Sequence, residues 1–229
     1  MADHLSEEEQ IEAFKQWWVD NGLKLVAAAV IAIGGTLSWQ GWQDSQQQYA
    51  EEGSAIYTAM IDVATTEADQ PLSDDQQQQI NATADQLKEQ YGDSGYAHLA
   101  ALLKAKLAVN ADNLDQAASE LEWVINNGPS ADLKGLAILR LARVEAARGN
   151  TDKALAILGD QDAGKMTSVY EEAKGDFHIS LGHYEAAYTA YQTAIDTEES
   201  GNTRQMSILR LKMSQAKPEN DTVETQGDS

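Results

Sequence analysis

The sequence predicts an all-α protein in which a single N-terminal transmembrane helix precedes an α-solenoid of about three to four helix hairpins. Three observations lead to this prediction. Residues 25–43 contain no ionisable side chain, three later segments repeat with similar spacing, and the 229-residue chain holds only 3 Pro. Because proline breaks helices while alanine, leucine and glutamine favour them, the composition supports helices throughout the chain.

The first 22 residues are expected to form a short amphipathic helix on the cytoplasmic side of a membrane. Ser6 and Glu9 have the spacing of a capping box, in which two side chains satisfy backbone N–H groups at the start of a helix. The apolar residues that follow share one helical face: Ile11, Phe14, Trp17 and Trp18. Beside a membrane, such a face lies in the interface between lipid and water.

Residues 23–43 are predicted to be a transmembrane signal anchor. The uncharged run within them has 19 residues. As a helix it would span roughly 28 Å, close to the roughly 30 Å of a hydrocarbon core. Lysine snorkels to lipid headgroups and tryptophan prefers membrane interfaces. We therefore expect Lys24 and Leu25 to mark the start of the anchor, and Trp39 and Trp42 to mark its end.

A buried core helix and a cleaved signal peptide are the two other interpretations of this run. The glycine pair Gly34-Gly35 and the flanking tryptophans suit a soluble core helix poorly. A signal peptide needs basic residues before the apolar run and small residues at a cleavage site after it. Here the preceding segment is acidic and the exit, SWQGW at residues 38–42, is bulky, so we predict an uncleaved anchor.

The distribution of lysine and arginine predicts the orientation of the anchor. Lys15 and Lys24 lie before the apolar run, whereas residues 44–87 contain neither lysine nor arginine. Basic residues near a transmembrane helix favour the cytoplasmic side. We therefore expect the N-terminus in the cytoplasm and residues 44–229 on the other side of the membrane.

An internal repeat predicts the fold of the exported part. Segments 107–121, 144–158 and 177–191 align without gaps, and their small residues coincide at Ala117, Ala154 and Ala187. The periods of 37 and 33 residues are close to the 34 residues of a tetratricopeptide repeat, a helix hairpin that stacks on its neighbours. We therefore predict a tetratricopeptide-repeat-like domain over residues 44–216.

Segments outside the three aligned repeats complete this domain. An earlier, weaker hairpin is expected around Ala84, with its first helix within residues 45–66. Residues 67–79 are expected to be an insertion or loop. Residues 203–215 are expected to form a basic amphipathic helix that covers the last hairpin, and residues 217–229 a disordered acidic tail.

The repeat alignment also predicts a peptide groove. Lys106 and Arg143 fall at the same position of the first helix in their hairpins, and Asp176 falls there in the third. In tetratricopeptide repeats that position usually faces the concave side. The predicted groove residues are Lys106, Arg143, Leu102 and Leu139. The two cations would hold a carboxylate of a client protein, and a salt bridge to a neighbouring hairpin is the alternative.

The composition argues against several classes of function. The chain has 37 Asp+Glu against 16 Lys+Arg, a net charge of −21, and no Cys. This charge argues against nucleic-acid binding, and the lack of cysteine excludes thiol nucleophiles and Cys-based metal sites. Residues 92–95, GDSG, resemble the surroundings of a serine-protease nucleophile but fall in a predicted turn. The four His lack a metal-binding spacing, so we expect no enzyme, cofactor or metal.

Three stretches resemble the ancillary SecYEG translocon subunit family (YfgM-like): EAFKQWWVDNG at 12–22, SWQGW at 38–42 and LRLARVEAARGNTDKALAIL at 139–158. The resemblance covers nearly the whole chain except the tail. It implies a non-enzymatic bacterial inner-membrane protein with a periplasmic repeat domain. The partners that it implies are the SecYEG translocon, the membrane-anchored periplasmic chaperone PpiD and exported client proteins, which the protein would help pass to periplasmic chaperones. A scaffold or assembly factor for another cell-envelope complex is the alternative.

Overall fold

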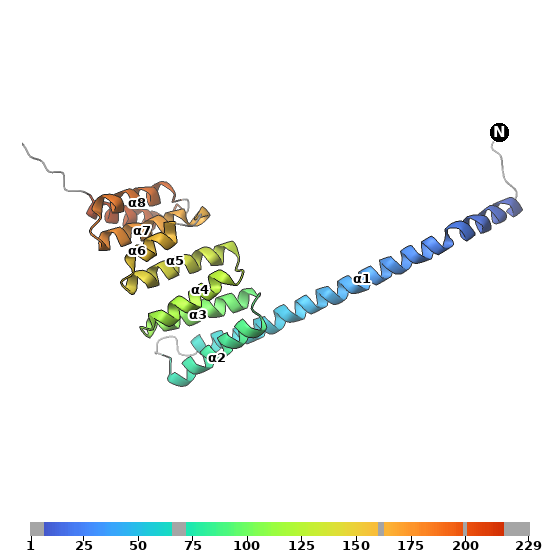
Figure 1. Ribbon diagram of the computed structural model, residues 1–229, viewed down its shortest axis with the longest axis horizontal. Helices are drawn as coiled ribbons and strands as arrows, with labels where there is room; N and C mark the ends of the chain where they lie inside the picture. The colour runs from blue at the N-terminus through green and yellow to red at the C-terminus, as the bar shows by residue number, and fades with distance from the viewer. Residues whose placement is uncertain (1–6, 66–71, 160–162, 199–200, 218–229) are drawn as a thin grey trace, which may run out of the picture. The chain divides into compact units, whose positions relative to one another are not determined.

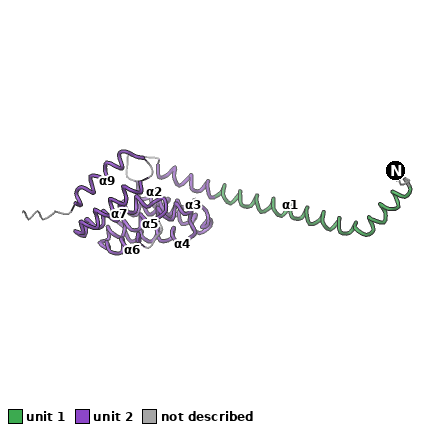
Figure 2. Tube along the Cα trace, turned by 90° about the horizontal axis from the view of Figure 1, so that it is seen from above, with its two compact units in different colours: residues 1–52 green, residues 53–229 purple. Residues whose placement is uncertain are grey.

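A computed structural model describes residues 7–65, 72–159, 163–198 and 201–217, and these residues form helices and turns with no strand among them (Figure 1). The prediction of an all-α chain is confirmed. The helices are α1 (Glu7–Thr65), α2 (Asp74–Gln90), α3 (Gly95–Asn110), α4 (Leu114–Asn126), α5 (Ala131–Ala147), α6 (Thr151–Gly159), the 3-10 helix η1 (Gly164–Met166), α7 (Thr167–Ser180), α8 (Tyr184–Asp196) and α9 (Thr203–Gln215). The chain divides into two compact units, residues 1–52 and residues 53–229 (Figure 2).

The first unit contains the N-terminal part of α1, which carries the uncharged run. Its large apolar side chains are exposed, with 74% of Ile31 and 62% of Leu37 accessible. Among the described residues, α1 is the one helix that is long and apolar enough to cross a membrane. A soluble helix of this composition would bury an apolar face, so α1 is a candidate membrane helix by length and composition.

Helix α1 is continuous across the two positions at which the composition of the chain changes, after residues 22 and 43. The amphipathic segment, the apolar run and the helix expected within residues 45–66 therefore lie on one helix. No proline occurs before Pro71, so nothing in this stretch removes a backbone donor and stops the helix.

The second unit begins with the last turns of α1, which pack against the end of α2 and the start of α3. A Cβ atom added at Gly53 would lie 3.4 Å from the ring of Tyr91. The rings of Tyr57 and Tyr96 have centroids 5.8 Å apart, and Met60 is buried. These contacts attach α1 to the remainder of the second unit.

Helix α2 begins earlier than the sequence predicts. Ser73 Oγ accepts a hydrogen bond from the Gln76 N–H at 3.3 Å, and the Gln76 side chain accepts one from the Ser73 N–H at 2.9 Å. This reciprocal capping box starts the helix at Asp74. The expectation of a loop through residue 79 is therefore wrong for residues 74–79, and residues 66–71 lie outside the described part of the chain.

Three hairpins follow, α3–α4, α5–α6 and α7–α8, and α9 packs on α8 at the end of the stack (Figure 1). One core cluster joins α3, α4 and α5, and a second joins α5, α6 and α7. Because each hairpin buries its apolar surface mainly against its neighbours in the chain, the second unit is an α-solenoid. The predicted repeat architecture is confirmed.

Small residues permit the close packing within hairpins. Ala117, Ala154 and Ala187, which the repeats align, are fully buried. At Gly175 of α7, an added Cβ atom would collide with the ring of Tyr191 on α8. The alignment therefore identifies buried positions at which a small residue lets the two helices of a hairpin pack together.

The turns inside the three hairpins share one backbone conformation. In each turn, the N–H of the residue after the left-handed position donates a hydrogen bond of 2.8–2.9 Å to the carbonyl five residues earlier. The left-handed residues are Asp112, Gly149 and Gly182, with φ of 58°, 85° and 75°. This pattern is a Schellman-type helix end, which glycine adopts most easily. It keeps the three repeats in register.

Candidate interaction groove

Helices α3 and α5, with parts of α4, line an open cavity of about 300 Å³. Lys106 of α3 and Arg143 of α5, which the repeats place at equivalent positions, both line this cavity, and Arg140 of α5 adds a third cation. The remaining lining residues are mostly apolar: Ala105, Val109, Asn110, Leu114, Leu121, Val144 and Ala147. We refer to this cavity as the α3–α5 groove.

The three cations of the α3–α5 groove have no counter-charge among the residues that the structure describes. Lys106, Arg140 and Arg143 are exposed, and within the described ranges none of them forms an ion pair or a hydrogen bond through its side chain. No carboxylate of the described part of the chain lines the groove. A salt bridge to a neighbouring hairpin, the alternative for Lys106 and Arg143, is therefore not formed among the residues that the structure describes.

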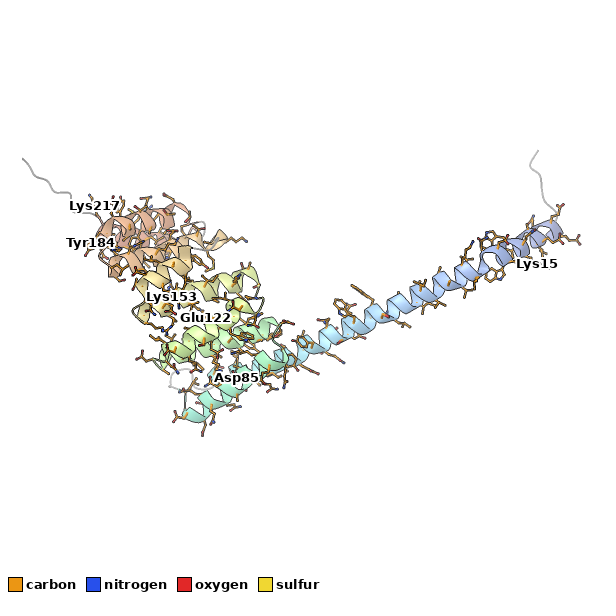
Figure 3. The ribbon with its side chains drawn as sticks, viewed as in Figure 1. Lys15, Asp85, Glu122, Lys153, Tyr184 and Lys217 are labelled. Atoms are coloured by element: carbon orange, nitrogen blue, oxygen red, sulfur yellow. The ribbon has the colours of Figure 1, made fainter. Side chains whose placement is uncertain are left out.

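Lys104, two residues before Lys106 on α3, makes such a salt bridge instead. Its side chain is largely buried, and its Nζ atom lies 2.6 Å from Asp85 Oδ1 and 3.0 Å from Glu120 Oε1. The Nζ atom of Lys88, on α2, lies 2.6 Å from Glu120 Oε2. Asp85, on the same helix, is labelled in Figure 3. Burial opposes the charge of Lys104, but its hydrogen bonds to Asp85 and Glu120 raise its pKa. This network joins α2, α3 and α4 on a side of α3 distinct from the groove.

The predicted groove residues Leu102 and Leu139 are each only 5% exposed and do not line the groove. Leu102 belongs to the core cluster of α3, α4 and α5, and Leu139 to the cluster of α5, α6 and α7. Each lies four residues before its groove cation, which rotates it by about 40° around the helix. In a helix packed on several sides, this rotation turns the side chain into the core.

Sequence reasoning missed Arg140 and the apolar lining residues Val109 and Leu114. Arg140, Arg143 and Ala147 are spaced by three and four residues, so they share one stripe along α5. That spacing was a usable signal for Arg140. Val109 and Leu114 flank the turn between α3 and α4. Their place in the groove is evident only once the fold brings this turn beside α5.

At the third repeat, the equivalent position is Asp176 of α7, which is paired within the chain. Lys212 of α9, 36 residues later, lies 2.8 Å from Asp176 and 2.8 Å from Glu172. Tyr191 of α8 also donates a hydrogen bond to Asp176 at 2.7 Å. Burial opposes the charge of Lys212, but the hydrogen bonds to Asp176 and Glu172 raise its pKa. Lys212 of α9 is therefore a counter-charge for Asp176, whereas no described residue provides one for the cations of the α3–α5 groove.

A fully buried charge stabilises the α5–α6 hairpin. Glu145 accepts hydrogen bonds from Arg148 at 2.8 Å, from Asn150 at 2.8 Å and from Lys153 at 2.9 Å. Burial opposes its charge, but the hydrogen bonds from Asn150 and Lys153 lower the pKa of Glu145. All three partners lie at or after the end of α5, so Glu145 fixes the turn between α5 and α6.

The four predicted membrane-anchor residues all lie on α1 and are exposed. Leu25 is 45% exposed, and Trp39 and Trp42 are 64% and 55% exposed. The two tryptophan rings stand side by side, with centroids 5.2 Å apart. Lys24 directly precedes the apolar run. The membrane contacts of these residues stay a prediction.

The GDSG segment has a structural role. Ser94 of the GDSG segment caps α3 by accepting a hydrogen bond from the Ala97 N–H at 3.2 Å. The rings of His178 and His183 are 5.9 Å apart. Among the described residues, no group of three or more His, Asp or Glu side chains is placed to hold a metal ion.

Comparisons with known proteins extend the sequence resemblance over most of the chain. Residues 15–217 match the family described as "Tetratricopeptide repeat-like domain". A relative from Haemophilus influenzae is 25% identical over 213 residues, covering 93% of this chain and 98% of its own length. One from Neisseria gonorrhoeae is 26% identical over 217 residues, covering 95% and 100%. One from Escherichia coli K12 is 23% identical over 206 residues, covering 90% and 95%.

All three relatives are named "Ancillary SecYEG translocon subunit". The predicted resemblance to that group is thereby confirmed. No solved structure gives a significant match to the chain.

Proposed function

The chain belongs to the tetratricopeptide repeat-like domain family, and we propose that it is a membrane-anchored, non-enzymatic interaction protein that acts as an ancillary subunit of the SecYEG translocon. The observation that carries this proposal is the near end-to-end match with three relatives that bear this name. A match of that extent includes both the apolar helix and the repeats. The similarity therefore extends beyond the repeats to the apolar part of the chain.

The proposed topology places the N-terminus in the cytoplasm, residues 23–43 in the inner membrane, and the solenoid in the periplasm. The exposed apolar run on α1 and the basic residues Lys15 and Lys24 before it support this orientation. The acidic residues of the solenoid, 31 against 14 basic residues over 44–229, would keep it away from anionic lipid headgroups.

In the proposed role, the solenoid contacts proteins as they leave the translocon and helps pass them to periplasmic chaperones, including the membrane-anchored chaperone PpiD. An α-solenoid offers an extended surface for protein binding rather than a closed catalytic pocket. His98 contacts the Asn127 carbonyl, and Glu120, Glu145 and Glu172 are held in ion pairs with lysine or arginine. These features support a binding function without catalysis.

Crosslinking from the membrane at native expression, followed by mass spectrometry, tests the proposed partners. We expect translocon subunits among the crosslinked proteins, and PpiD together with exported clients if the hand-off role holds. A matched control carries an unrelated transmembrane helix in place of residues 23–43, which separates contacts of the solenoid from contacts of the anchor. Recovery of another envelope complex without translocon subunits would instead support the scaffold alternative.

A protease that cannot cross the inner membrane tests the orientation. After the outer membrane is made permeable, the solenoid should be digested while a fragment that contains the N-terminus stays protected. Protection of residues 44–229 under these conditions would show the opposite orientation.

A further inference from the structure

We propose that the α3–α5 groove binds an acidic and apolar segment of a partner protein, whose carboxylates pair with Lys106, Arg140 and Arg143. An apolar side chain of the same segment would contact the groove residues Val109 and Leu114. This proposal deepens the proposed function, since it rests on the solenoid being an interaction domain and assigns a ligand class to one of its surfaces.

The composition of the groove favours this ligand. Three of its ten lining residues are cations, none is a carboxylate, and most of the others are apolar. Over residues 44–229 acidic groups outnumber basic ones by 31 to 14, yet the cations that line this groove have no described carboxylate partner. Arginine guanidinium groups pair with carboxylates through two parallel hydrogen bonds. Charge complementarity therefore selects a negatively charged partner at this place, although the domain as a whole is acidic.

The arrangement of like charges supports the same ligand. Arg140 and Arg143 are three residues apart on α5, a spacing at which like charges repel each other across one helical face. Lys106 of α3 lines the same groove. A carboxylate bound among the three would relieve this repulsion, so the groove is electrostatically prepared for an anionic group.

At the last hairpin, a covering helix provides a counter-charge for the residue at the equivalent repeat position. Asp176 is the equivalent of Arg143, and Lys212 of α9 lies beside it at 2.8 Å. There the covering segment is α9, and it brings the charge opposite to that of the surface beneath it. By the same rule, a segment that covers Lys106 and Arg143 brings carboxylates.

The size of the groove sets the size of the ligand. Its volume of about 300 Å³ is at the lower end of ligand pockets, which span roughly 300–1,000 Å³. A groove of this size takes a few side chains of a short segment. The chain's own residues 218–229 contain four carboxylates but only one large aliphatic residue, Val223, so they match the charge of the groove better than its apolar lining.

Fluorescence anisotropy with the purified full-length chain in detergent micelles tests the proposal. The probe is a fluorescein-labelled twelve-residue peptide of leucine and glutamate, compared with versions that carry glutamine or lysine in place of glutamate. We expect the glutamate peptide to bind at least about tenfold more tightly than the glutamine peptide, the factor that one well-placed charged hydrogen bond supplies. Equal binding of the two peptides, or no binding of the glutamate peptide, would overturn the proposal.

Paired variants distinguish binding at the groove from a general effect of the protein's net charge. The double variant R140E/R143E reverses two groove cations, whereas K134E/R210E reverses two exposed cations that do not line the groove. Both change the net charge by the same amount. We expect R140E/R143E to lose at least about tenfold in affinity and K134E/R210E to change less than about twofold. Equal losses in the two variants would contradict a specific site.

Two further variants examine the apolar lining and the tail. Ala147→Trp fills the groove without altering its charge, and we expect it to weaken the glutamate peptide while the circular dichroism spectrum stays unchanged. Removal of residues 218–229 should leave the affinity unchanged. A tenfold gain on removal would show that the tail occupies the groove, which would overturn a partner segment as its occupant. Because this assay contains no translocon, its outcome is independent of the crosslinking test of the proposed function.

Discussion

The α3–α5 groove and the α7–α9 end of the solenoid use equivalent repeat positions in opposite ways. At the α7–α9 end, Lys212 pairs with Asp176 and Glu172, so opposite charges meet between neighbouring helices. In the groove, Lys106 and Arg143 occupy the same positions with like charges and no described counter-charge. The difference indicates that this repeat position stabilises the stack where α9 closes it and stays available for a ligand where the groove is open.

The strongest test of this comparison examines the buried side of α5, two residues from Arg143. If charges on the packed sides of the helices stabilise the fold, replacement of the fully buried Glu145 should be costly. We expect Glu145→Ala to lower the free energy of unfolding by about 3 kcal/mol, because it leaves a cavity and removes an ion-pair partner from both Arg148 and Lys153. Urea unfolding followed by circular dichroism measures this change.

The pH dependence of this effect has a defined sign. The pKa of Glu145 is lowered in the folded state, so its charge stabilises the fold above the unfolded pKa of about 4.3. This contribution is lost as the pH falls through the folded pKa. The stability difference between the wild type and Glu145→Ala should therefore stay constant above about pH 5 and shrink on further acidification. A difference that grows with acidification would contradict the pairing.

The second test concerns the close packing that supports the α7–α9 end. A Cβ atom at Gly175 would collide with the ring of Tyr191, whose hydroxyl is held by Asp176 at 2.7 Å. We expect Gly175→Ala to destabilise the fold by about 2 kcal/mol, since the clash outweighs the better helix propensity of alanine. Thermal unfolding measures this loss of stability.

Gly95→Ala is the matched control for this substitution. Gly95 is also helical, and no heavy atom lies within 4 Å of an added Cβ there. We expect this variant to be as stable as the wild type or slightly more so. Equal destabilisation of the two variants would attribute the effect to the backbone and not to Tyr191.

The third test compares the two equivalent positions directly. Lys212→Met should weaken the attachment of α9 by about 1 kcal/mol, because partly exposed ion pairs contribute at that level. Arg143→Met, which breaks no described ion pair, should change stability by less than about 0.5 kcal/mol. Hydrogen exchange of the α9 amides measures the local opening. Similar protection in both variants would show that Lys212 does not hold α9.

The sequence predicted the repeat register well because small residues recur at points where helices must approach closely. Ala117, Ala154 and Ala187 mark those points, and the alignment that they define also placed Lys106 and Arg143 beside one cavity. A residue that serves the same steric purpose in every repeat leaves a periodic signal. Periodicity therefore predicted the fold and brought together two of the three cations that line the groove.

Features that depend on packing between helices could not be predicted in the same way. Leu102 and Leu139 are buried because neighbouring helices cover the sides of α3 and α5 on which they lie, and one helix considered alone does not show which of its sides are covered. The pairing of Lys212 with Asp176 joins residues 36 positions apart. It requires the placement of α9, which follows from the fold and not from local pattern.

The smallest expected effect is also the most specific to the comparison. Arg143→Glu gives the groove the charge arrangement of the α7–α9 end, with an acidic residue opposite Lys106. It also removes the repulsion between Arg140 and position 143, a pair spaced three residues apart on α5. We therefore expect this charge reversal to raise the free energy of unfolding by up to about 0.5 kcal/mol.

A charge reversal on the exposed face of a helix ordinarily leaves stability unchanged, so even a small gain would be informative. Lys134→Glu is the control, since Lys134 is exposed on the same helix and does not line the groove. Urea unfolding at low and high salt distinguishes the two variants, because a gain in stability that comes from relieved repulsion should shrink as salt screens the charges. A loss of stability in Arg143→Glu would mean that Arg143 already has a favourable role within the fold, and the groove would then lose its standing as an open, unsatisfied site.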